Sequence, residues 1–257
     1  MKEQTITVSG RKIRLFRGGG GPPLLFLHDT FCPFWMPFHE SLSAHYEVFL
    51  PVHPGFAGSE EGFEDFTAIE DMVFHYLDLC EVLHLDRPVL IGASFGGWIA
   101  AEWAIRYSAS LERLILIGAL GLRLPEAPAA DILSLDPAAS RRVVFADPSS
   151  TLALEVISET PKPDDMVSQI LARQTLARFG WQFPDNPRLH RYLHRIKIPT
   201  LIIWGERDGF VPPAHGKAYL EAIAKAELVR VPHAGHLPHI EQPRTSYEAI
   251  LSFLKAR

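Results

Sequence analysis

The sequence is poor in the features that mark several common classes of protein. Only two of its 257 residues are cysteine, Cys32 and Cys80, which is too few for a disulfide framework. We therefore expect free, buried thiols. Basic residues are not in excess either, because 25 Lys and Arg stand against 30 Asp and Glu, for a formal net charge of −5. A chain of this charge lacks the positive surface that neutralises nucleic-acid phosphates, so nucleic acid is not expected as a partner.

Long hydrophobic runs are also missing. The longest uncharged apolar stretch, residues 114–122, is far shorter than the roughly 20 residues that a membrane-spanning helix requires. The first residues include a lysine and a glutamate and lead into an alternating pattern, unlike the apolar run of a secretory signal. We expect a cytoplasmic protein with no membrane span and no export signal.

The chain does contain a recurring succession of short apolar runs and helical stretches. Residues 4–8 and 12–16 alternate polar and apolar side chains around Ser9-Gly10, which predicts a β-hairpin. Continuously apolar runs, typical of buried parallel strands, follow at 23–27, 47–50, 88–91, 114–117 and 199–204. Helical stretches lie at 68–83, 97–106 and 213–224. This alternation predicts the α/β class, with a mostly parallel twisted sheet covered by helices on both faces.

One interval breaks this rhythm. Residues 122–196 contain scattered prolines and short amphipathic stretches, such as 166–179, but no run that predicts a buried strand. Strand and helix patterns flank the interval, and its composition is not that of a linker. We therefore predict a helical cap or lid at 122–196, inserted after the sixth strand of a core domain that comprises 1–121 and 197–257.

The most informative string is VLIGASFGGWIAA at residues 89–101, which contains a G-x-S-x-G pattern centred on Ser94. An apolar strand precedes the pattern and a helix follows it, as in a nucleophile elbow. A sharp turn there would raise the Ser94 hydroxyl above the carboxyl end of the sheet, with Gly92 and Gly96 leaving room for it. The helix N-terminus would add backbone N–H groups and the positive end of its dipole. The alternative is an N-cap serine beside packing glycines.

A serine hydroxyl needs a base, and the base needs a group that orients it. Two later segments offer these groups, each as an apolar strand followed by a loop. They are residues 201–212, with Glu206 and Asp208, and residues 228–241, with His233, His236 and His239. Because ligands bind at the carboxyl ends of parallel strands, we expect both loops to lie near Ser94.

Together these residues resemble the α/β-hydrolase fold family, in its serine-nucleophile ester hydrolase branch with a helical cap. The resemblance rests on the order Ser, Asp, His, on the elbow at 92–96, and on the strings Gly205-Glu206-Arg207-Asp208 and Ala234-Gly235-His236, and it covers essentially the whole chain. It implies that Ser94 is the nucleophile, His236 the general base and Asp208 the residue that holds the imidazole. Glu206 is the competing carboxylate, which strand alternation places differently.

The resemblance also implies an oxyanion hole made of backbone N–H groups. Phe95, directly after the nucleophile, supplies one, and the loop after the third predicted strand supplies another, for which we choose Thr30. The family usually has His-Gly at the end of that strand, whereas this sequence has His28-Asp29. We interpret Asp29 as a turn carboxylate; the alternative places it at the mouth of the pocket, where it would bias the charge of the substrate.

We expect neither a metal nor a cofactor. The three histidines at 233, 236 and 239 have no cysteine or acidic partner close by with which to form a zinc site. The glycine run at 18–21 is not followed by Lys-Ser or Lys-Thr, so it does not predict a phosphate cradle. The expected chemistry requires three side chains and two backbone amides, in a monomer or a homodimer.

Aromatic side chains in the predicted cap and the oxyanion loop favour an apolar substrate pocket. Its expected lining is Phe31, Trp35, Phe145, Phe179 and Trp181, unless these side chains only pack the cap onto the core. The serine nucleophile predicts hydrolysis of small to medium apolar carboxylic esters through an acyl-enzyme. A C–C bond hydrolase of the ring-fission type is an alternative, although the Gly-Pro-Gly-type loop is absent after His28. The other alternative is a ligand-binding or sensor protein on the same fold, with little turnover.

Overall fold

A single eight-stranded sheet forms the centre of the protein. The structure, a computed structural model, describes residues 1–181 and 184–256. Its strands are β1 (Lys2–Val8), β2 (Arg11–Gly18), β3 (Pro23–Leu27), β4 (Glu47–Pro51), β5 (Val89–Ala93), β6 (Leu114–Ile117), β7 (Thr200–Gly205) and β8 (Ala226–Val231). They follow the spatial order β1-β2-β4-β3-β5-β6-β7-β8. Among the strand pairs of the described residues, β1–β2 and β2–β4 are antiparallel and the other five are parallel, which confirms the predicted mostly parallel sheet.

The first hairpin follows directly from its local sequence. Ser9 and Gly10 both have positive φ angles, 47° and 83°, as a tight turn between two right-twisted strands requires. Side chains of β2 alternate toward the core, where Ile13 and Leu15 are fully buried. The predicted hairpin at the N-terminal edge of the sheet is therefore confirmed.

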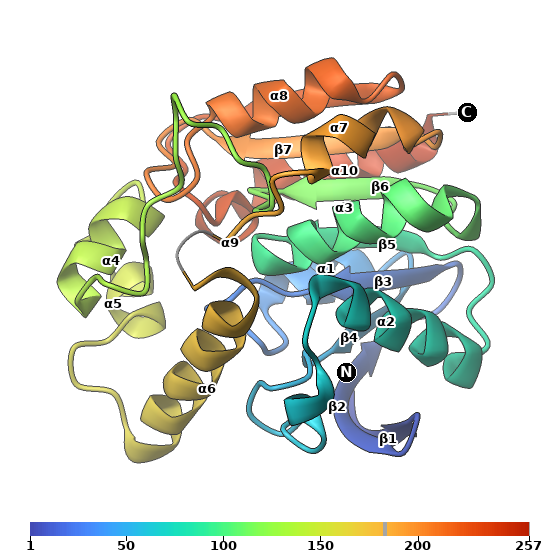
Figure 1. Cartoon of the computed structure of the whole chain (residues 1–257), viewed down its shortest axis with the longest axis horizontal. Helices are drawn as coiled ribbons and strands as arrows, with labels where there is room; N and C mark the ends of the chain where they lie inside the picture. Colours follow the sequence, from blue (N-terminus) through green and yellow to red (C-terminus); the bar gives the residue numbers. More distant parts are fainter. Residues whose placement is uncertain (182–183, 257) are drawn as a thin grey trace.

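Helices cover both faces of the sheet. The α-helices are α1 (Pro37–Ser43), α2 (Ile69–Leu83), α3 (Phe95–Tyr107), α4 (Pro137–Val144), α5 (Thr151–Val156), α6 (Pro163–Gly180), α7 (Leu189–Tyr192), α8 (Ala214–Ala222), α9 (Pro238–Glu241) and α10 (Pro243–Lys255), with 3₁₀ turns η1 (Phe63–Asp65), η2 (Ser108–Ser110) and η3 (Leu193–Arg195). In Figure 1, α2 and α3 lie in front of the sheet, and α1, α9 and α10 lie behind it. The sequence patterns did not predict α1, α9 or α10.

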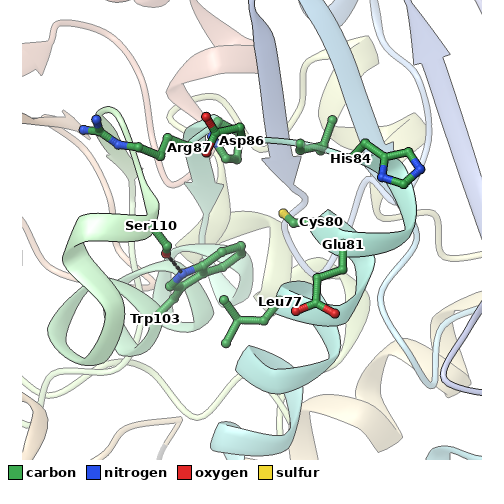
Figure 2. A pocket seen from close by; sticks show the side chains of 10 residues that line it. Leu77, Cys80, Glu81, His84, Asp86, Arg87, Trp103 and Ser110 are labelled. Atoms are coloured by element: carbon green, nitrogen blue, oxygen red, sulfur yellow. Dashed lines mark hydrogen bonds between the residues drawn. The ribbon is translucent and has the colours of Figure 1, made fainter.

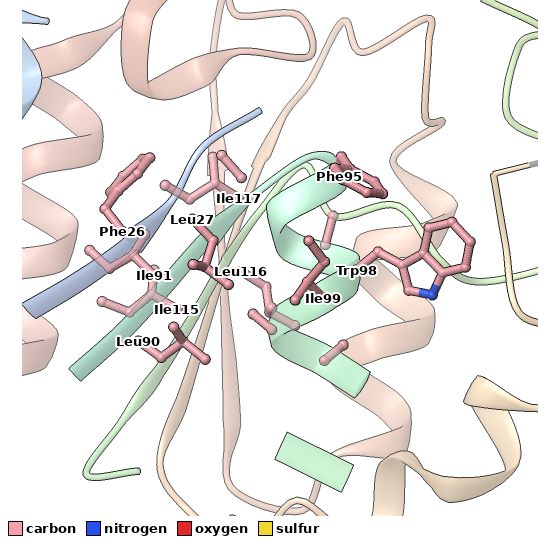
Figure 3. Packing of buried hydrophobic residues seen from close by; sticks show 14 of the residues in the cluster. Phe26, Leu27, Leu90, Ile91, Phe95, Trp98, Ile99, Ile115, Leu116 and Ile117 are labelled. Atoms are coloured by element: carbon pink, nitrogen blue, oxygen red, sulfur yellow. The ribbon is translucent and has the colours of Figure 1, made fainter. Parts of the chain in front are cut away.

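The core is built from the central strands and the helices that face them. Successive side chains of a strand point to opposite faces, so Leu116 packs toward Ile99 of α3 while Ile115 and Ile117 point to the other face (Figure 3). All five residues of β5 are buried. A strand buried on both faces explains why its sequence is continuously apolar instead of alternating.

The segment between β6 and β7 departs from the strand-helix rhythm, as its sequence indicates. It contributes α4 to α7 and η3, and none of its described residues joins the eight-stranded sheet. In Figure 1, α4, α5 and α6 stand beside the sheet, next to the end at which the arrow of β6 points. The predicted range 122–196 includes residues 182 and 183, and the predicted core ends at 257; these three residues lie outside the described chain.

Candidate active site

Ser94 occupies a strained turn between β5 and α3. Its φ and ψ angles are 51° and −114°, a combination that residues other than glycine rarely adopt. Its N–H donates to the carbonyl of Ile117 at 2.8 Å, which ties the turn to the end of β6. A Cβ atom on Gly96 would collide with the carbonyl of Leu27. Only glycine at 96 therefore allows the turn to pack against β3.

The structure brings Ser94, His236 and Asp208 into one hydrogen-bonded line. Ser94 Oγ lies 2.7 Å from His236 Nε2, and His236 Nδ1 lies 2.9 Å from Asp208 Oδ2. The three side chains are 4% exposed or less, so the line is shielded from bulk water. Because a carboxylate only accepts hydrogen bonds, Nδ1 carries the ring proton and Nε2 accepts from the serine hydroxyl.

The loop after β7 places Asp208, not Glu206, beside the histidine. Oδ1 of Asp208 accepts the N–H groups of Phe210 at 3.0 Å and Val211 at 2.8 Å, which leaves Oδ2 for His236. Glu206 is 43% exposed at its side chain and lies 4.0 Å from Arg230. The expected reason, strand alternation, is wrong, because β7 ends at Gly205 and residues two apart in a strand share a face. The turn that follows, in which Asp208 N–H donates to the Gly205 carbonyl at 3.4 Å, separates the two carboxylates.

The backbone at the end of α4 holds the two loops that carry Asp208 and His236. Gly209 donates its N–H to Val143 at 3.0 Å, and His236 donates its N–H to Val144 at 2.6 Å. The segment between β6 and β7 is thus anchored directly to both loops. Sequence reasoning did not identify these backbone contacts, because no side-chain pattern encodes them.

Glu241 of α9 reinforces the same connection, and sequence reasoning assigned it no role. Its Oε1 accepts the N–H of Gly235 and its Oε2 accepts the N–H of Ala146, both at 2.8 Å. Burial raises the pKa of Glu241, against the lowering effect of these backbone donors. A Cβ atom on Gly235 would collide with the carbonyl of Val144. Glycine at this position lets the histidine loop approach the end of α4.

The two N–H groups expected to form an oxyanion hole are those of Phe95 and Thr30. Phe95 is the first residue of α3, where N–H groups have no intrahelical partner. Within residues 1–181 and 184–256, neither N–H has a hydrogen-bond acceptor. Gly96 N–H donates to the carbonyl of His28 at 3.2 Å, which joins the two loops that carry these groups.

Two buried, neutral histidines, His28 and His53, hold the loop that follows β3. His28 Nδ1–H donates to the carbonyl of Asp29 at 2.6 Å, while His28 Nε2 accepts the N–H of His53 at 2.9 Å. His53 Nε2–H in turn donates to the carbonyl of His28 at 2.8 Å, and the Tyr76 hydroxyl donates to His53 Nδ1. Burial lowers the pKa of His28 to about 4 and that of His53 well below its usual value.

Asp29, which replaces the expected glycine, is the turn carboxylate that we predicted. Its Oδ1 accepts the N–H of Phe31 at 2.7 Å and that of Cys32 at 2.8 Å. Its Oδ2 lies 3.6 Å from His239 Nε2, and both side chains are 1% exposed. This burial and these contacts favour the turn over the alternative position at the mouth of the pocket.

The five aromatic residues expected to line a pocket lie in different surroundings. The ring of Phe31 lies 6.4 Å from that of Phe210, which itself lies 4.6 Å from the ring of His236. Phe179 stacks on Phe95 at 5.9 Å, and Phe145, which is 2% exposed, follows the anchored end of α4.

The two tryptophans of that set have other surroundings. Trp35 packs against His39 at 5.6 Å and donates its Nε1–H to Glu40 at 2.8 Å, so it belongs to the surroundings of α1. Trp181 is 74% exposed. Most of its surface faces solvent, which favours a surface position over the expected place in a pocket wall.

Two cavities differ in their relation to this site. The larger, about 520 Å³, lies between α2, α3 and the start of β5, and none of the candidate site residues lines it (Figure 2). The smaller, about 360 Å³, has Leu120 and Val211 in its wall. Leu120 N–H donates to the Ser94 carbonyl and Val211 N–H donates to Asp208, so this cavity adjoins the hydrogen-bonded line.

The histidines at 233, 236 and 239 do not converge on a common point. His236 contacts Ser94 and Asp208, His239 faces Asp29, and His233 is exposed. Among the residues that the structure describes, no group of three His, Cys, Asp or Glu side chains is placed to hold a metal ion.

Comparison with known proteins identifies the family. The sequence model of the alpha/beta hydrolase family matches residues 18–249. The chain belongs to the alpha/beta hydrolase family. The hydrolase assignment and the fold predicted from the elbow are thereby confirmed, although the family alone does not specify the bond that is cleaved.

Relatives within the alpha/beta hydrolase family act on more than one type of bond. The chain is 26% identical to 2-hydroxy-6-oxo-2,4-heptadienoate hydrolase of Pseudomonas putida, over 98% of this chain and 95% of that protein. It is 24% identical to the human monoacylglycerol lipase ABHD6, over 93% of this chain and 77% of that protein. A variant of the meta-cleavage product hydrolase CumD from Pseudomonas fluorescens IP01 superposes with a TM-score of 0.82, at 22% identity over 98% and 97% of the two chains.

The described helices of this alpha/beta hydrolase offer no membrane-spanning candidate. None of them combines the length and the apolar character that crossing a bilayer would take.

Proposed function

We propose that this protein hydrolyses uncharged, apolar carboxylic esters through an acyl-enzyme on Ser94. The observation that carries the proposal is the line from Ser94 Oγ through His236 to Asp208, at 2.7 and 2.9 Å. These distances are within the hydrogen-bond reach that proton transfer from a nucleophile to its base needs. Family membership supports a hydrolase that uses this arrangement.

The proposed reaction has two stages. Ser94 Oγ attacks the ester carbonyl carbon while His236 Nε2 takes the hydroxyl proton, and the carbonyl oxygen, now negative, accepts the N–H groups of Phe95 and Thr30. His236 then protonates the departing alcohol, which leaves the acyl group on Ser94. In the second stage His236 removes a proton from water and the resulting hydroxide adds to the acyl carbon. The bond between that carbon and Ser94 Oγ then breaks, His236 returns the proton to Oγ, and the carboxylic acid is released. Asp208 stabilises the imidazolium in both stages without itself becoming protonated.

Charge near the site supports an uncharged substrate. The loop at 28–36 contains the buried carboxylate of Asp29 and no lysine or arginine. Four arginines between β6 and β7 are engaged with the chain itself: Arg123, in the wall of the smaller cavity, with Asp185; Arg141 with Ile157 and Glu159; Arg173 with Leu133; and Arg178 with Glu64 and Phe66. An anionic substrate would need an available cation to balance its charge.

Phe31 and Phe179 are the aromatic residues best placed to contact an apolar substrate. Both are half-buried. Phe31 is separated from His236 by the ring of Phe210, and Phe179 stacks directly on Phe95. We propose that residues 122–196 act as a cap, because α4 contacts the loops of Asp208 and His236 and α6 carries Phe179. The two cysteines are free and buried, which supports a reducing compartment such as the cytoplasm.

Hydrolysis of a C–C bond is the second candidate, and the relatives favour it about as strongly. Two of the proteins compared above are named for dienoate or meta-cleavage products, and each comparison covers 98% of this chain. A dienoate substrate carries a carboxylate, so this candidate requires a cation that becomes available when the substrate binds. The absence of the Gly-Pro-Gly-type loop does not exclude this candidate, given those similarities.

The test compares ester and dienoate substrates on one preparation. The wild-type protein and the variant Ser94→Ala are incubated with a fluorophosphonate probe, with p-nitrophenyl esters of increasing acyl length, and with a 2-hydroxy-6-oxo-dienoate. We expect labelling and p-nitrophenol release by the wild-type protein only, with a slower reaction or none on the dienoate.

Each of the other results points to a specific alternative. Turnover of the dienoate at least tenfold faster, in kcat/KM, than any of the esters would favour C–C hydrolysis. Absence of labelling and of turnover on both substrates would contradict a hydrolase and favour a binding protein on the same fold. Full activity of Ser94→Ala would remove Ser94 from the proposed role.

A further inference from the structure

A second buried Asp–His pair lies at the same edge of the sheet as the first. Asp29 Oδ2 and His239 Nε2 are 3.6 Å apart, and each side chain is 1% exposed. Neither residue takes part in the proposed reaction. Burying a carboxylate is costly unless it is hydrogen-bonded and paired with an opposite charge, so its presence in this position calls for a specific role.

The carboxylate of Asp29 holds the loop that carries the Thr30 N–H. By accepting the N–H groups of Phe31 at 2.7 Å and Cys32 at 2.8 Å, Oδ1 fixes the two peptide groups that follow Thr30. The carbonyl of Asp29 accepts from His28 Nδ1, so the residue is fixed on both sides. The Thr30 N–H is left between these contacts with no acceptor in the described chain.

His239 connects this loop to the element that carries the base. It lies on α9, three residues after His236, and its Nδ1 has no partner in the described chain. Burial raises the pKa of Asp29, but the close approach and charge of His239, with smaller contributions from His28 and the Phe31 N–H, outweigh it and lower the pKa overall. Asp29 is therefore retained as a carboxylate, the form that accepts both backbone donors.

We infer that Asp29 and His239 are positioning residues, which hold the oxyanion loop after β3 in register with the histidine loop after β8. The inference rests on the proposed function, since it concerns the stabilisation of an oxyanion. The pair does not touch the substrate. It sets the direction of the Thr30 N–H relative to Phe95 N–H and His236. It therefore stabilises the transition state, in which the oxyanion forms, more than the bound substrate.

The main variants are Asp29→Ala and Asp29→Asn, assayed on the best p-nitrophenyl ester. Alanine removes both acceptor bonds, and we expect kcat to fall about 10–100-fold, below the full loss of about 10²–10³-fold for an absent oxyanion donor, with KM changed less than about threefold. Asparagine keeps Oδ1 as an acceptor for both N–H groups, and we expect it to retain kcat within about fivefold.

A transition-state analogue separates positioning from general stability. A trifluoromethyl ketone, which forms a charged tetrahedral adduct on the serine, should lose affinity for Asp29→Ala by the same factor as kcat/KM. The matched control is Asp71→Ala, because Asp71 also accepts two backbone N–H groups, from Thr67 at 2.7 Å and Ala68 at 2.8 Å, at the start of α2. That variant should lower the melting temperature and leave kcat and analogue affinity unchanged.

The coupling of the two residues is tested by His239→Gln and the double variant. If the pair acts as a unit, Asp29→Ala/His239→Gln is no slower than Asp29→Ala alone. Independent, multiplicative losses would overturn the coupling. If Asp29→Ala is insoluble, His239→Gln on its own carries the test, with an expected loss of about 3–10-fold in kcat and a matching loss of analogue affinity.

Failure of this inference differs from failure of the proposed function. A wild-type protein that reacts with neither ester nor fluorophosphonate contradicts the proposed function. An active wild-type protein whose Asp29→Ala variant has a lower melting temperature but unchanged kcat and analogue affinity contradicts only the positioning role. A change confined to KM would also overturn it.

Discussion

The two Asp–His pairs of this protein contain the same groups but differ in what lies beyond the histidine. Asp208 and His236 are 2.9 Å apart, and the ring leads on to Ser94 Oγ. Asp29 and His239 are 3.6 Å apart, and the ring leads to no reactive group in the described chain. The comparison teaches that the partner on the far side of the imidazole, not the Asp–His contact itself, decides whether a pair can move protons.

The acceptor side of the two pairs is nearly identical. In each, one carboxylate oxygen accepts the N–H groups of residues two and three positions later, from Phe210 and Val211 in one pair and from Phe31 and Cys32 in the other. A buried aspartate at a strand end is thus used twice to shape a turn. In one turn its second oxygen orients a base, and in the other it holds a backbone loop.

The largest expected effect removes the reactive end of the first pair. We predict that Ser94→Ala and His236→Ala each lower kcat by about 10⁴-fold or more on the best ester, and that the double variant is no worse than either, because the residues act as a unit. Circular dichroism should show an unchanged fold. If either single variant kept a tenth of the wild-type kcat, the first pair would no longer differ from the second in its effect on catalysis.

The second largest effect is expected at Asp208, the carboxylate of the first pair. Asp208→Asn places an amide donor opposite His236 Nδ1 and so favours the tautomer with the proton on Nε2, which cannot accept from Ser94. We expect kcat to fall about 10³–10⁴-fold. Glu206→Gln, whose carboxylate lies 4.0 Å from Arg230 at the surface, should change kcat less than about threefold. A larger loss of kcat in Glu206→Gln than in Asp208→Asn would show that Glu206, and not Asp208, orients His236.

A smaller effect is expected where α9 connects to the end of α4. Glu241→Ala leaves the N–H groups of Gly235 and Ala146 without their acceptor, at a cost of about 2 kcal/mol in the free energy of unfolding. For a chain of this size the melting temperature should drop by about 4–8 °C. Glu248→Ala is the control, since its contact with Arg244 is exposed and should contribute less than about 0.5 kcal/mol. Equal shifts in the two variants would contradict the bridging role.

The smallest effect is a pH dependence that arises around the second pair. Burial lowers the pKa of His28 to about 4, and burial with the nearby His239 lowers that of His39 to about 3, from 6.5. The folded protein keeps both rings neutral, while the unfolded chain takes up protons below about pH 6.5. Their contribution to stability is therefore complete above that pH and is lost as the pH falls toward 3–4.

His39→Gln tests this pH dependence. Its amide oxygen can still accept the Met36 N–H that His39 Nδ1 accepts at 2.9 Å, as a glutamine does in a capping box. We expect the fall in melting temperature between pH 6.5 and 4 to become shallower. The exposed His194→Gln should leave the slope unchanged, and an unchanged slope in His39→Gln would show that its ring takes no part.

Local features of the chain made several predictions reliable. The turn at Ser9-Gly10, the buried runs of β3, β5 and β6, and the elbow around Ser94 all follow from steric limits that act within a few residues. The helices α9 and α10 were not predicted, because α9 has four residues and both begin at a proline within a polar, histidine-rich stretch. Exposure of Trp181 could not be predicted either, since a tryptophan is equally compatible with a pocket and a surface.

What the sequence by itself determined is the class of fold, the strained serine turn and the chemical groups available at one edge of the sheet. Backbone sterics and the periodicity of apolar side chains act locally, so they can be followed along the chain. Only the tertiary structure decided that Asp29 meets His239, that Glu241 meets Ala146 and that the end of α4 contacts both loops. These contacts join residues far apart in sequence, and their partners are selected by the packing of strands and helices, which no local pattern specifies.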